Sequence, residues 1–280
     1  MKPTTTFRVG GDLEIRRLGF GAMRLPTEPA DARAASVALL RRAVELGVTL
    51  IDTAHLYGWG ANEELVAEAL HPYPSGLLVT TKVGVVRPAA DAWAYDARPA
   101  SLRTQVDEAL RRLRTDRVEL LQLHRIDPDT PLADQLGALG ELRSEGKIGR
   151  IGLSEVTVAE LAEARSIVDI ASVQNRYNLL DREYEPVLKA CEAADIAFLP
   201  WRPLAPGAAD KEPEIAAVAS ELEASPTQVA LAWLLAHSPV MAPIPGTASL
   251  GHLEENVAAA DIRLTRDQYD RLNRAAAPPC

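Results

Sequence analysis

The sequence has little of what holds small or metal-bound folds together. Only two of its 280 residues are cysteines, Cys191 and Cys280, and no CxxC or CxxxxH spacing occurs. This scarcity argues against a disulfide scaffold and against a structural zinc site. A chain of this length buries about three quarters of the surface of its unfolded form, so it needs neither of them to fold.

Positive charge and long hydrophobic runs are scarce as well. The 30 lysines and arginines face 39 acidic residues, and the net charge of −9 disfavours a nucleic-acid surface. No apolar run approaches the about 20 residues that span a bilayer, and the N-terminal MKPTTTFRVG lacks the apolar core of a signal peptide. We therefore expect a soluble cytoplasmic protein, monomeric or weakly homo-oligomeric, that binds neither nucleic acid nor membrane.

What the sequence does contain is an alternation of strand and helix patterns. Its composition is that of a globular protein, with 47% hydrophobic and 25% charged residues. Eight short runs are apolar on both faces, as buried parallel strands are. These runs are Leu18–Met23, Thr49–Thr53, Leu77–Thr81, Val118–Leu123, Arg150–Leu153, Ser172–Gln174, Ile196–Trp201 and Met241–Ile244.

Helical periodicity fills the segments between these runs. The predicted helices are Ala34–Leu46, Asn62–Leu70, Leu102–Leu113, Leu132–Glu145, Val158–Ile167, Pro186–Ala194, Glu212–Glu223, Pro226–His237, Leu250–Ala259 and Thr265–Ala275. This alternation favours an α/β fold, a (β/α)8 TIM barrel, over the alternative of a doubly wound open sheet. No linker rich in proline, glycine or serine divides the chain, so residues 1–280 are predicted to form a single barrel domain.

Two segments fall outside this alternation. Two short alternating runs within Phe7–Ile15 flank a central GGD turn, which predicts a β-hairpin. The stretch Arg87–Pro99, with Trp93 and Tyr95, is predicted to be a long loop after the third strand. In a barrel such a loop lies at the C-terminal rim, where sites are built, so we expect it to shape substrate choice.

Two charged residues stand at the ends of apolar strand patterns. Lys82 ends LLVTTK, and Asp52 ends TLID. Lysine is seldom buried without a partner, so Lys82 is either a rim lysine whose ammonium reaches water or a catalytic lysine. Asp52 is either a cap for the next helix or the counter-ion of Lys82 on the adjacent strand end.

Tyr57 and His124 complete a constellation that fits carbonyl reduction. Tyr57 follows Asp52 by five residues, and His124 ends the fourth strand pattern. A tyrosine hydroxyl has a pKa of about 10, and a nearby ammonium lowers that pKa by stabilising the phenolate. The tyrosine would protonate the oxygen of a carbonyl that accepts hydride, while the histidine orients it. Since none of these residues supplies hydride, a nicotinamide cofactor is required.

The order of these motifs resembles that of the aldo-keto reductase family, and nearly the whole chain takes part. The resemblance rests on LGFGAMRL, DTAHLYG, NEELVAEAL, TKVG, LLQLHR, GKIGRIGLSE, VQNRYN and IPGT followed by HLEEN. The segments around ALHPYP and IPGTASLGHLEEN are similar to a short bacterial branch that includes pyridoxal reductases. The resemblance implies a (β/α)8 barrel whose base is closed by the N-terminal hairpin.

The resemblance also implies the role of each candidate catalytic residue. Tyr57 corresponds to the general acid and Lys82 to the partner that lowers its pKa. Asp52 corresponds to the counter-ion of the lysine, and His124 to the residue that orients the carbonyl. The implied activity is NADPH-dependent reduction of an aldehyde or ketone, so the expected partner is a small carbonyl compound and no metal is implied.

The cofactor positions implied by the resemblance lie mostly at strand ends. Ser154 and Gln174 correspond to ligands of the nicotinamide carboxamide. Glu155 stands where asparagine is common, and a carboxylate accepts from the amide NH₂ but cannot donate to its oxygen. Trp201 is either the ring that stacks on the nicotinamide or a core tryptophan. The implied contacts are Gly21, Ala22, Asp52, Ser154, Glu155, Gln174, Trp201, Arg202, Pro203, Leu204, Gly246, Thr247, His252, Glu255 and Asn256.

The implied pocket for the 2′-phosphate is less basic than the family's usual one. Gly246 and His252 stand where lysine and arginine are usual, while Thr247 keeps a hydroxyl. The backbone N–H groups of the helix that starts after Thr247 still favour a phosphate. NADP(H) is therefore the expected cofactor, with NAD(H) as the alternative.

Two other functions remain compatible with the sequence alone. Lys82 would serve a Schiff-base aldolase if its amine were unprotonated, and a barrel that binds NADP without turnover would be regulatory. Asp52 and His55 lack the further ligands that a metal site needs. His71 and His237 lie near predicted helix ends and are expected to be solvated.

Overall fold

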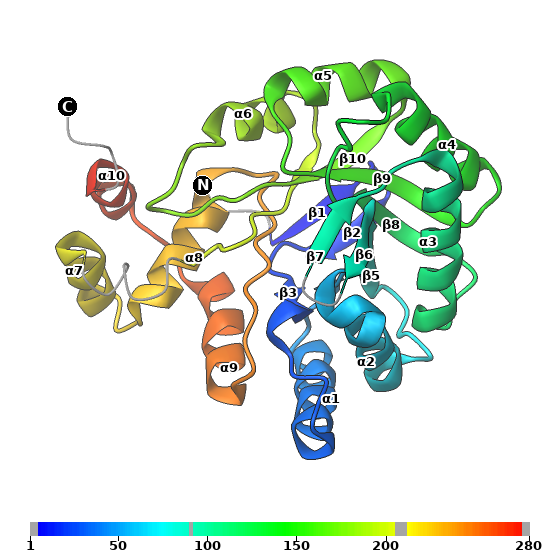
Figure 1. Ribbon diagram of the computed structural model, residues 1–280. Coiled ribbons are helices and arrows are strands. Elements are labelled where there is room, and N and C mark those ends of the chain that lie inside the picture. The colour runs from blue at the N-terminus through cyan, green and yellow to red at the C-terminus, as the bar shows by residue number, and fades with distance from the viewer. Residues whose placement is uncertain (1–4, 90–91, 205–211, 276–280) are drawn as a thin grey trace.

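The centre of the molecule is a set of short parallel strands. The computed structural model describes residues 5–89, 92–204 and 212–275 (Figure 1). Within them, one parallel sheet has the order β3-β4-β5-β8-β9-β10-β11. Its strands are β3 (Phe20–Gly21), β4 (Leu50–Asp52), β5 (Leu78–Val83), β8 (Val118–Leu123), β9 (Ile148–Ser154), β10 (Ile170–Gln174) and β11 (Ala197–Phe198).

The eighth predicted strand, Met241–Ile244, is not a regular strand. It forms only an isolated parallel bridge to β11, because the prolines at 243 and 245 have no N–H group to give to a ladder. The segment still joins β11 to β3. Gly19 N donates to Pro243 O at 2.9 Å, and Gly21 N donates to Pro245 O at 3.2 Å. The strands therefore close into a barrel, and the alternative of an open sheet is wrong.

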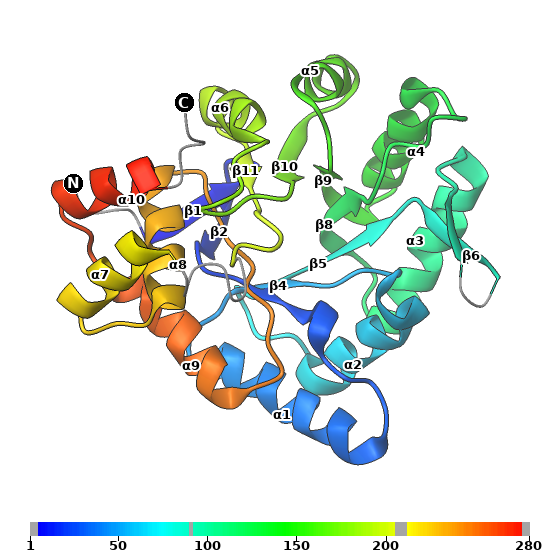
Figure 2. The same ribbon diagram turned by 60° about the vertical axis from the view of Figure 1, so that its left-hand side comes forward.

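A ring of helices surrounds the strands (Figure 2). They are α1 (Ala30–Glu45), α2 (Ala61–Leu70), α3 (Pro99–Leu113), α4 (Leu132–Ser144), α5 (Val158–Ile167), α6 (Glu185–Ala193), α7 (Pro213–Glu221), α8 (Pro226–His237), α9 (Leu250–Ala258) and α10 (Arg266–Ala275), with the 3₁₀ turns η1 (Ala22–Arg24), η2 (Tyr57–Gly60) and η4 (Ala259–Asp261). In α1, Val37, Leu40 and Ala43 recur at helical spacing and are buried. Among the described residues, no helix combines the length and apolarity needed to cross a membrane.

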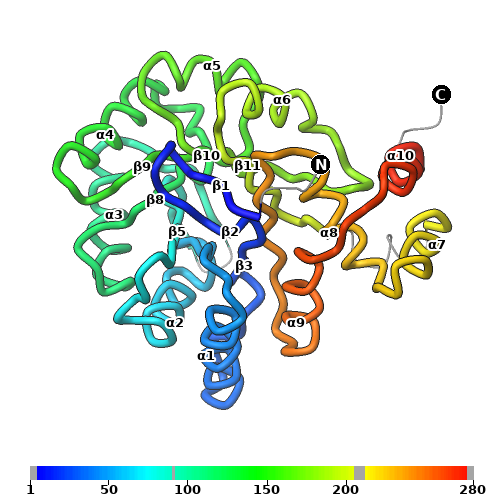
Figure 3. Tube along the Cα trace, turned by 180° about the vertical axis from the view of Figure 1, so that it is seen from behind, coloured from blue at the N-terminus to red at the C-terminus, as the bar shows by residue number. Residues whose placement is uncertain are grey.

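The N-terminal hairpin closes one end of the barrel. Its strands β1 (Thr6–Val9) and β2 (Leu13–Arg16) are antiparallel. Val9 and Ile15 share one hydrophobic cluster with Leu50, Leu78 and Leu120, which lie early in their strands. Figure 3 shows this hairpin lying across the end of the barrel. A site must therefore be built at the opposite end, where the carboxyl ends of the strands meet.

The stretch Arg87–Pro99 is not the irregular loop that was predicted. Strand β6 (Val85–Ala89) pairs antiparallel with β7 (Ala92–Tyr95), and α3 begins at Pro99. Trp93 and Tyr95 are both exposed, and their rings meet edge to face with centroids 5.3 Å apart. Because side chains alternate along a strand, the period-two spacing of these two aromatic residues places them on one face of β7.

His237 is not solvated as predicted, whereas His71 is exposed. The His237 side chain, at the end of α8, is 9% exposed, and its Nε2 lies within hydrogen-bond distance of a Glu185 carboxylate oxygen of α6, at 3.1 Å. Its ring nitrogens also contact the hydroxyls of Tyr177 at 3.1 Å and Tyr269 at 2.8 Å. We call these four residues, Tyr177, Glu185, His237 and Tyr269, the α6–α8–α10 cluster. Helix packing buries the histidine, which its position near a helix end does not reveal.

Candidate active site

Four side chains predicted to act together meet at the open end of the barrel. Asp52 ends β4, Lys82 lies in β5, and His124 follows β8 directly. Tyr57 begins η2, in the loop that leaves β4. Lys82 Nζ donates to Asp52 Oδ2 at 2.7 Å and to Tyr57 Oη at 3.1 Å. Adjacent parallel strands thus bring together residues that are 30 positions apart in sequence.

The ion pair of Lys82 and Asp52 is buried. The side chain of Lys82 is 0% exposed and that of Asp52 is 2% exposed, so Lys82 is not a rim lysine that reaches water. Burial alone would lower the pKa of Lys82, but the charge of Asp52 and the contact with Tyr57 raise this pKa above its ordinary value. A third bond, to the Thr53 carbonyl at 2.9 Å, completes the three acceptors that an ammonium can satisfy. Lys82 is therefore a fixed positive charge.

Tyr57 lies between this charge and His124. Burial raises the pKa of the Tyr57 hydroxyl, and the positive charge of Lys82 opposes that rise without cancelling it. Its ring lies perpendicular to that of His124, with centroids 6.2 Å apart. The sequence predicted only the lowering effect of the lysine, whereas burial has the larger effect here. Tyr57 is therefore protonated at neutral pH, which is the state that a proton donor needs.

His124 is a buried neutral imidazole. Burial, followed by the charge of Lys82, holds its pKa well below the ordinary value. Among the described residues, its buried Nδ1 has no hydrogen-bond partner. A neutral imidazole donates from one nitrogen and accepts at the other, so this side chain has hydrogen-bonding capacity that the protein leaves unused. Nδ1 is fully buried, whereas Nε2 also lacks a partner among the described residues and is not enclosed, so a carbonyl oxygen beside Tyr57 would use the capacity of Nε2.

We call the four side chains of Asp52, Tyr57, Lys82 and His124 the tetrad. Gln122, which the sequence did not point to, also holds the tetrad in place. The second oxygen of Asp52 accepts from Gln122 Nε2 at 3.2 Å and from Gln174 Nε2 at 2.8 Å. Both glutamines are buried. These bonds fix the carboxylate so that its other oxygen faces Lys82. A single polar residue inside the apolar run LLQLH was the available signal for Gln122.

A second set of buried polar residues fixes the loop that carries Tyr57. Asn62 accepts from Thr53 Oγ1 at 2.6 Å and donates to the Ala22 carbonyl at 2.9 Å. Glu63 accepts from Arg112 Nε at 2.6 Å, which ties the start of α2 to α3. Gly60, before α2, has a φ of +95°, and an added Cβ would lie 2.6 Å from the Arg112 side chain. The NEELVAEAL motif thus begins with residues that position the loop.

The predicted carboxamide ligands stand at neighbouring strand ends. Ser154 ends β9 and Gln174 ends β10, and both are buried. Glu155, at a φ of +57°, turns its carboxylate toward the barrel rim. There its Oε1 accepts from Trp201 Nε1 at 2.5 Å and from the Arg176 N–H at 2.8 Å. Glu155 is therefore engaged with the tryptophan that was predicted to be either a stacking platform or a core residue. Trp201 is half-buried and packs against the hydrophobic cluster that contains Leu199 and Ile244, so both interpretations remain open.

The segment predicted to bind the 2′-phosphate packs against the first strand. A Cβ on Gly246 would lie 2.6 Å from the Gly21 carbonyl oxygen, so this position has no room for a side chain. Thr247 Oγ1 accepts from the N–H of Ser249, which caps α9. His252 and Glu255 are exposed in α9, while Asn256 is buried. The remaining predicted contacts continue from β3 and β11: Ala22 is buried in η1, Arg202 is exposed, Pro203 is buried and Leu204 is half-buried.

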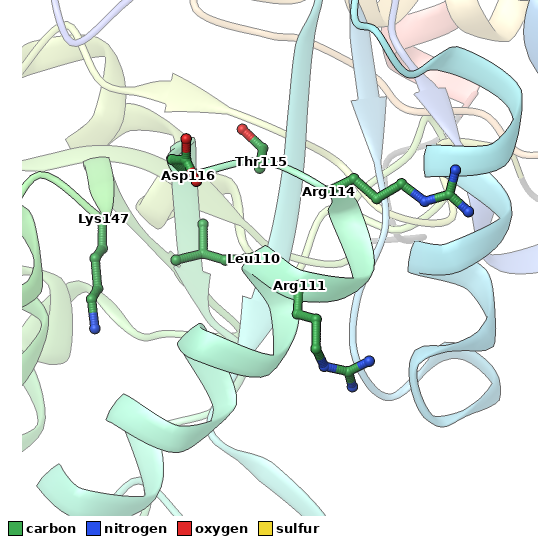
Figure 4. A pocket seen from close by; sticks show the side chains of 6 residues that line it. All are labelled: Leu110, Arg111, Arg114, Thr115, Asp116 and Lys147. Atoms are coloured by element: carbon green, nitrogen blue, oxygen red, sulfur yellow. The ribbon is translucent and has the colours of Figure 1, made fainter.

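A cavity at the other end of the barrel is not part of this site. It has a volume of about 400 Å³ and lies beside the last turn of α3 (Figure 4). Asp116 and Lys147, which precede β8 and β9, contribute to its lining. The cavity therefore lies toward the amino ends of the strands, away from the tetrad, and Lys147 is bonded there to Asp107 at 2.6 Å.

Comparison with known proteins agrees with this architecture. Residues 17–277 match the model of the aldo/keto reductase family. Over 269 residues the chain is 45% identical to an uncharacterized oxidoreductase of Schizosaccharomyces pombe, which covers 94% of this chain and 87% of that protein. Over 280 residues it is 36% identical to pyridoxine 4-dehydrogenase of Escherichia coli, with coverage of 96% and 98%.

A solved structure extends the likeness to three dimensions. An aldo/keto reductase from Klebsiella pneumoniae, in complex with NADP and acetate, matches with a TM-score of 0.87 at 28% identity, covering 98% of this chain and 96% of that one. The chain belongs to the aldo/keto reductase family and is an oxidoreductase of that class. The family and the α/β barrel fold predicted from the motifs are confirmed.

Proposed function

We propose that this protein is an NADPH-dependent reductase that converts aldehydes or ketones to alcohols, with Tyr57 as the general acid. The observation that carries the proposal is the position of Lys82 Nζ, which bonds both Asp52 and Tyr57 at the open end of the barrel. A charge fixed in this way favours the phenolate that remains after proton transfer. The tyrosine is thus both protonated before the reaction and stabilised after it.

The residues at the strand ends fit a nicotinamide carboxamide. Ser154 Oγ accepts from Arg125, which leaves its hydroxyl proton free to donate. Gln174 uses its NH₂ group on Asp52 and Gln122, and its oxygen has no partner among the described residues. When bound, the nicotinamide supplies a hydride to the substrate's carbonyl carbon. Trp201, held by Glu155, would lie against the ring.

Side chains of the protein bind and protonate the oxygen of the carbonyl. His124 donates a hydrogen bond that orients this oxygen, and Tyr57 transfers its proton to it as hydride reaches the carbon. The phenolate is held by Lys82, whose own proton stays in place because Asp52 is its counter-ion. Solvent then returns a proton to Tyr57. Carbonyl, hydride and proton together give the alcohol.

The cofactor we propose is NADP(H), with NAD(H) bound less tightly. The reductase from Klebsiella pneumoniae was solved with NADP, which supports this choice. In the present chain the 2′-phosphate would meet Thr247, the first N–H groups of α9 and His252. Hydrogen bonds to a charged group contribute about 1.5 to 3 kcal/mol each, so two or three are enough for a preference.

Of the alternative functions, the Schiff-base aldolase has less support. That reaction needs a neutral lysine amine, whereas Lys82 is buried against Asp52 with its pKa raised. Borohydride trapping with a substrate carbonyl should therefore leave Lys82 unmodified. A barrel that binds NADP without turnover differs from a reductase only in its kinetics.

The test is NADPH consumption with a panel of aldehydes, quinones and pyridoxal, with the alcohol products identified. Pyridoxal is included because pyridoxine 4-dehydrogenase is among the relatives. We expect stoichiometric alcohol formation with at least one member of the panel. Tight binding of NADPH without oxidation by any of them would favour the regulatory barrel and contradict the proposal.

A further inference from the structure

Arg125 is a second fixed cation at the mouth of the proposed site. It follows His124 in the chain, at the end of β8. Its Nη1 donates to the His124 carbonyl at 2.5 Å and to Ser154 Oγ at 3.2 Å. These two bonds place the half-buried guanidinium between the carboxyl ends of β8 and β9. The side chain is thus anchored by one nitrogen.

The rest of the guanidinium has no partner within the part of the chain that the structure describes. In that part of the chain, no carboxylate oxygen lies within 4.0 Å of a nitrogen of the Arg125 guanidinium. Neither Nε nor Nη2 of Arg125 donates a hydrogen bond there. The nearby acids are used elsewhere: Asp52 holds Lys82, and Glu155 holds Trp201. By contrast, the more deeply buried Arg112 is paired with Glu63. Charged groups withdrawn from water are normally paired, so Arg125 has an unused capacity for an anion.

This charge acts on the same space as the catalytic tetrad. After burial and the nearer charge of Lys82, Arg125 also affects the pKa values of Tyr57 and His124, favouring the less positive form of each. The charge of Arg125 also acts to lower the pKa of Tyr184, at the start of α6, where burial has the larger, opposite effect. Together with the bonds of Arg125 to the His124 carbonyl and Ser154 Oγ, this places the guanidinium close to Tyr57 and His124, where the substrate's carbonyl would bind.

We propose that Arg125 binds a carboxylate of the substrate, so that the preferred substrates are aldehydes or ketones that carry a carboxylate near the carbonyl. This inference rests on the proposed function. The Nε and Nη2 groups form a planar pair of donors that matches the two oxygens of a carboxylate. His124 and Tyr57 would hold the carbonyl oxygen while Arg125 fixes the other end of the molecule.

The test compares acids with their neutral esters. The substrates are succinic semialdehyde and para-carboxybenzaldehyde, each beside its methyl ester, with saturating NADPH. Charged hydrogen bonds contribute about 1.5 to 3 kcal/mol, so we expect the wild type to prefer at least one acid by about tenfold or more in kcat/KM. In Arg125→Met this preference should fall to near one, chiefly through a higher KM for the acid. Arg125→Lys should keep part of it, because it retains charge but not the planar pair.

Two controls separate recognition from structural support. A residue that only anchored Ser154 and His124 would, when removed, slow acid and ester alike. Arg111→Met makes the same change in charge at the cavity near the other end of the barrel and should leave the preference unchanged. Added salt should weaken the wild-type preference but have little effect on Arg125→Met.

The outcomes distinguish this inference from the proposed function. Equal turnover of acid and ester by the wild type, for both pairs, would overturn the inference and leave the reductase intact. Loss of acid and ester activity by the same factor in Arg125→Met would also overturn it. No turnover of any of the four compounds or of the wider aldehyde panel would overturn both.

Discussion

The tetrad and the α6–α8–α10 cluster both hold a tyrosine beside titratable groups, yet the charged partners of the two tyrosines have opposite sign. Tyr57 accepts a hydrogen bond from the ammonium of Lys82 at 3.1 Å. Tyr177 donates to the carboxylate of Glu185 and also contacts His237. Burial raises the pKa of each hydroxyl, but Lys82 opposes the rise at Tyr57 whereas Glu185 adds to it at Tyr177. The sign of the partner's charge therefore decides whether loss of the tyrosine proton becomes easier or harder than burial alone would make it.

The two regions also differ in what surrounds them. The tetrad lies at the carboxyl ends of strands, with an unpartnered nitrogen on His124. The α6–α8–α10 cluster lies between helices, and the ring of His237 stacks on Trp233 with centroids 4.3 Å apart. The first arrangement leaves hydrogen-bonding capacity for a ligand, while the second uses its capacity to join helices. We infer catalysis for the first and structural support for the second.

Removing a charge from the tetrad should give the largest effect. We expect Lys82→Met to lower kcat by about 10² to 10⁴, because the phenolate of Tyr57 loses its stabilising charge. It should also lower the free energy of unfolding by about 3–5 kcal/mol, because the buried carboxylate of Asp52 is left without its counter-ion. Steady-state kinetics and urea unfolding measure the two effects.

A charge-balanced variant separates these effects. Adding Asp52→Asn to Lys82→Met removes the unpaired carboxylate, so stability should return in large part while activity should not. Recovery of activity in the double variant would contradict the role given to Lys82.

Removing the carboxylate of Glu185 from the α6–α8–α10 cluster should instead change how the stability of the fold depends on pH. Burial alone would raise the pKa of Glu185, but hydrogen bonds from His237 and Tyr177 lower it from 4.5 to about 2. A depressed carboxyl pKa stabilises the fold above the unfolded value, and that stability is lost as pH falls through the folded value. Because Glu185 is partly exposed, we expect the contribution to be about 1–2 kcal/mol.

Urea unfolding near neutral pH and again near pH ~3 measures this contribution. The free energy of unfolding of Glu185→Gln should fall less over this interval than that of the wild type, while NADPH turnover stays unchanged. An equal fall in both proteins would show that the cluster does not hold Glu185 ionised.

The contact between the Glu155 carboxylate and the Trp201 indole extends the comparison to the binding of the cofactor. Glu155 accepts from Trp201 Nε1, so we expect Glu155→Ala to raise the Kd for NADPH by about tenfold as the indole loses its anchor. In a Trp201→Phe background the same change should have little effect, and Glu155→Gln should retain most of the affinity. Calorimetric titration of the four proteins of this cycle measures the coupling. Additive effects of the two changes would contradict a shared role.

The smallest effect is expected at His252, which lies outside both clusters. His252→Arg adds a permanent charge at the start of α9, so we expect the preference for NADPH over NADH to rise a few-fold. Dissociation constants for both cofactors measure it. An unchanged ratio would show that this side chain does not face the 2′-phosphate.

The sequence revealed the tetrad because its members break strong local patterns. A lysine, an aspartate and a histidine at the ends of apolar strands stand out, and the order of strands in a barrel then brings them together. His237 gave no such signal, because its partner Glu185 lies 52 positions away on another helix. The direction of the Glu155 side chain depends on its positive φ, which no residue pattern marks.

The fold was predictable for a similar reason, and its exceptions are local. Alternating strand and helix patterns indicate a barrel, since every strand must be buried on both faces. Within Met241–Ile244 the apolar pattern outweighed the proline that removes a ladder donor, so a regular strand was predicted where only a bridge forms. Around Trp93 the neighbouring residues are mostly alanines, so only Trp93 and Tyr95 marked the alternation of a hairpin strand.

The most direct test of the comparison removes one hydroxyl at a time, in the variants Tyr57→Phe and Tyr177→Phe. The readouts are the single-turnover rate with bound NADPH and the free energy of unfolding. Tyr57→Phe should bind NADPH and lose about 10² to 10⁴ in rate, because only the proton donor is removed. Tyr177→Phe should keep its rate and lose about 1–3 kcal/mol of stability, because the Glu185 carboxylate loses a hydrogen-bond donor. A rate close to that of the wild type in Tyr57→Phe would contradict the account.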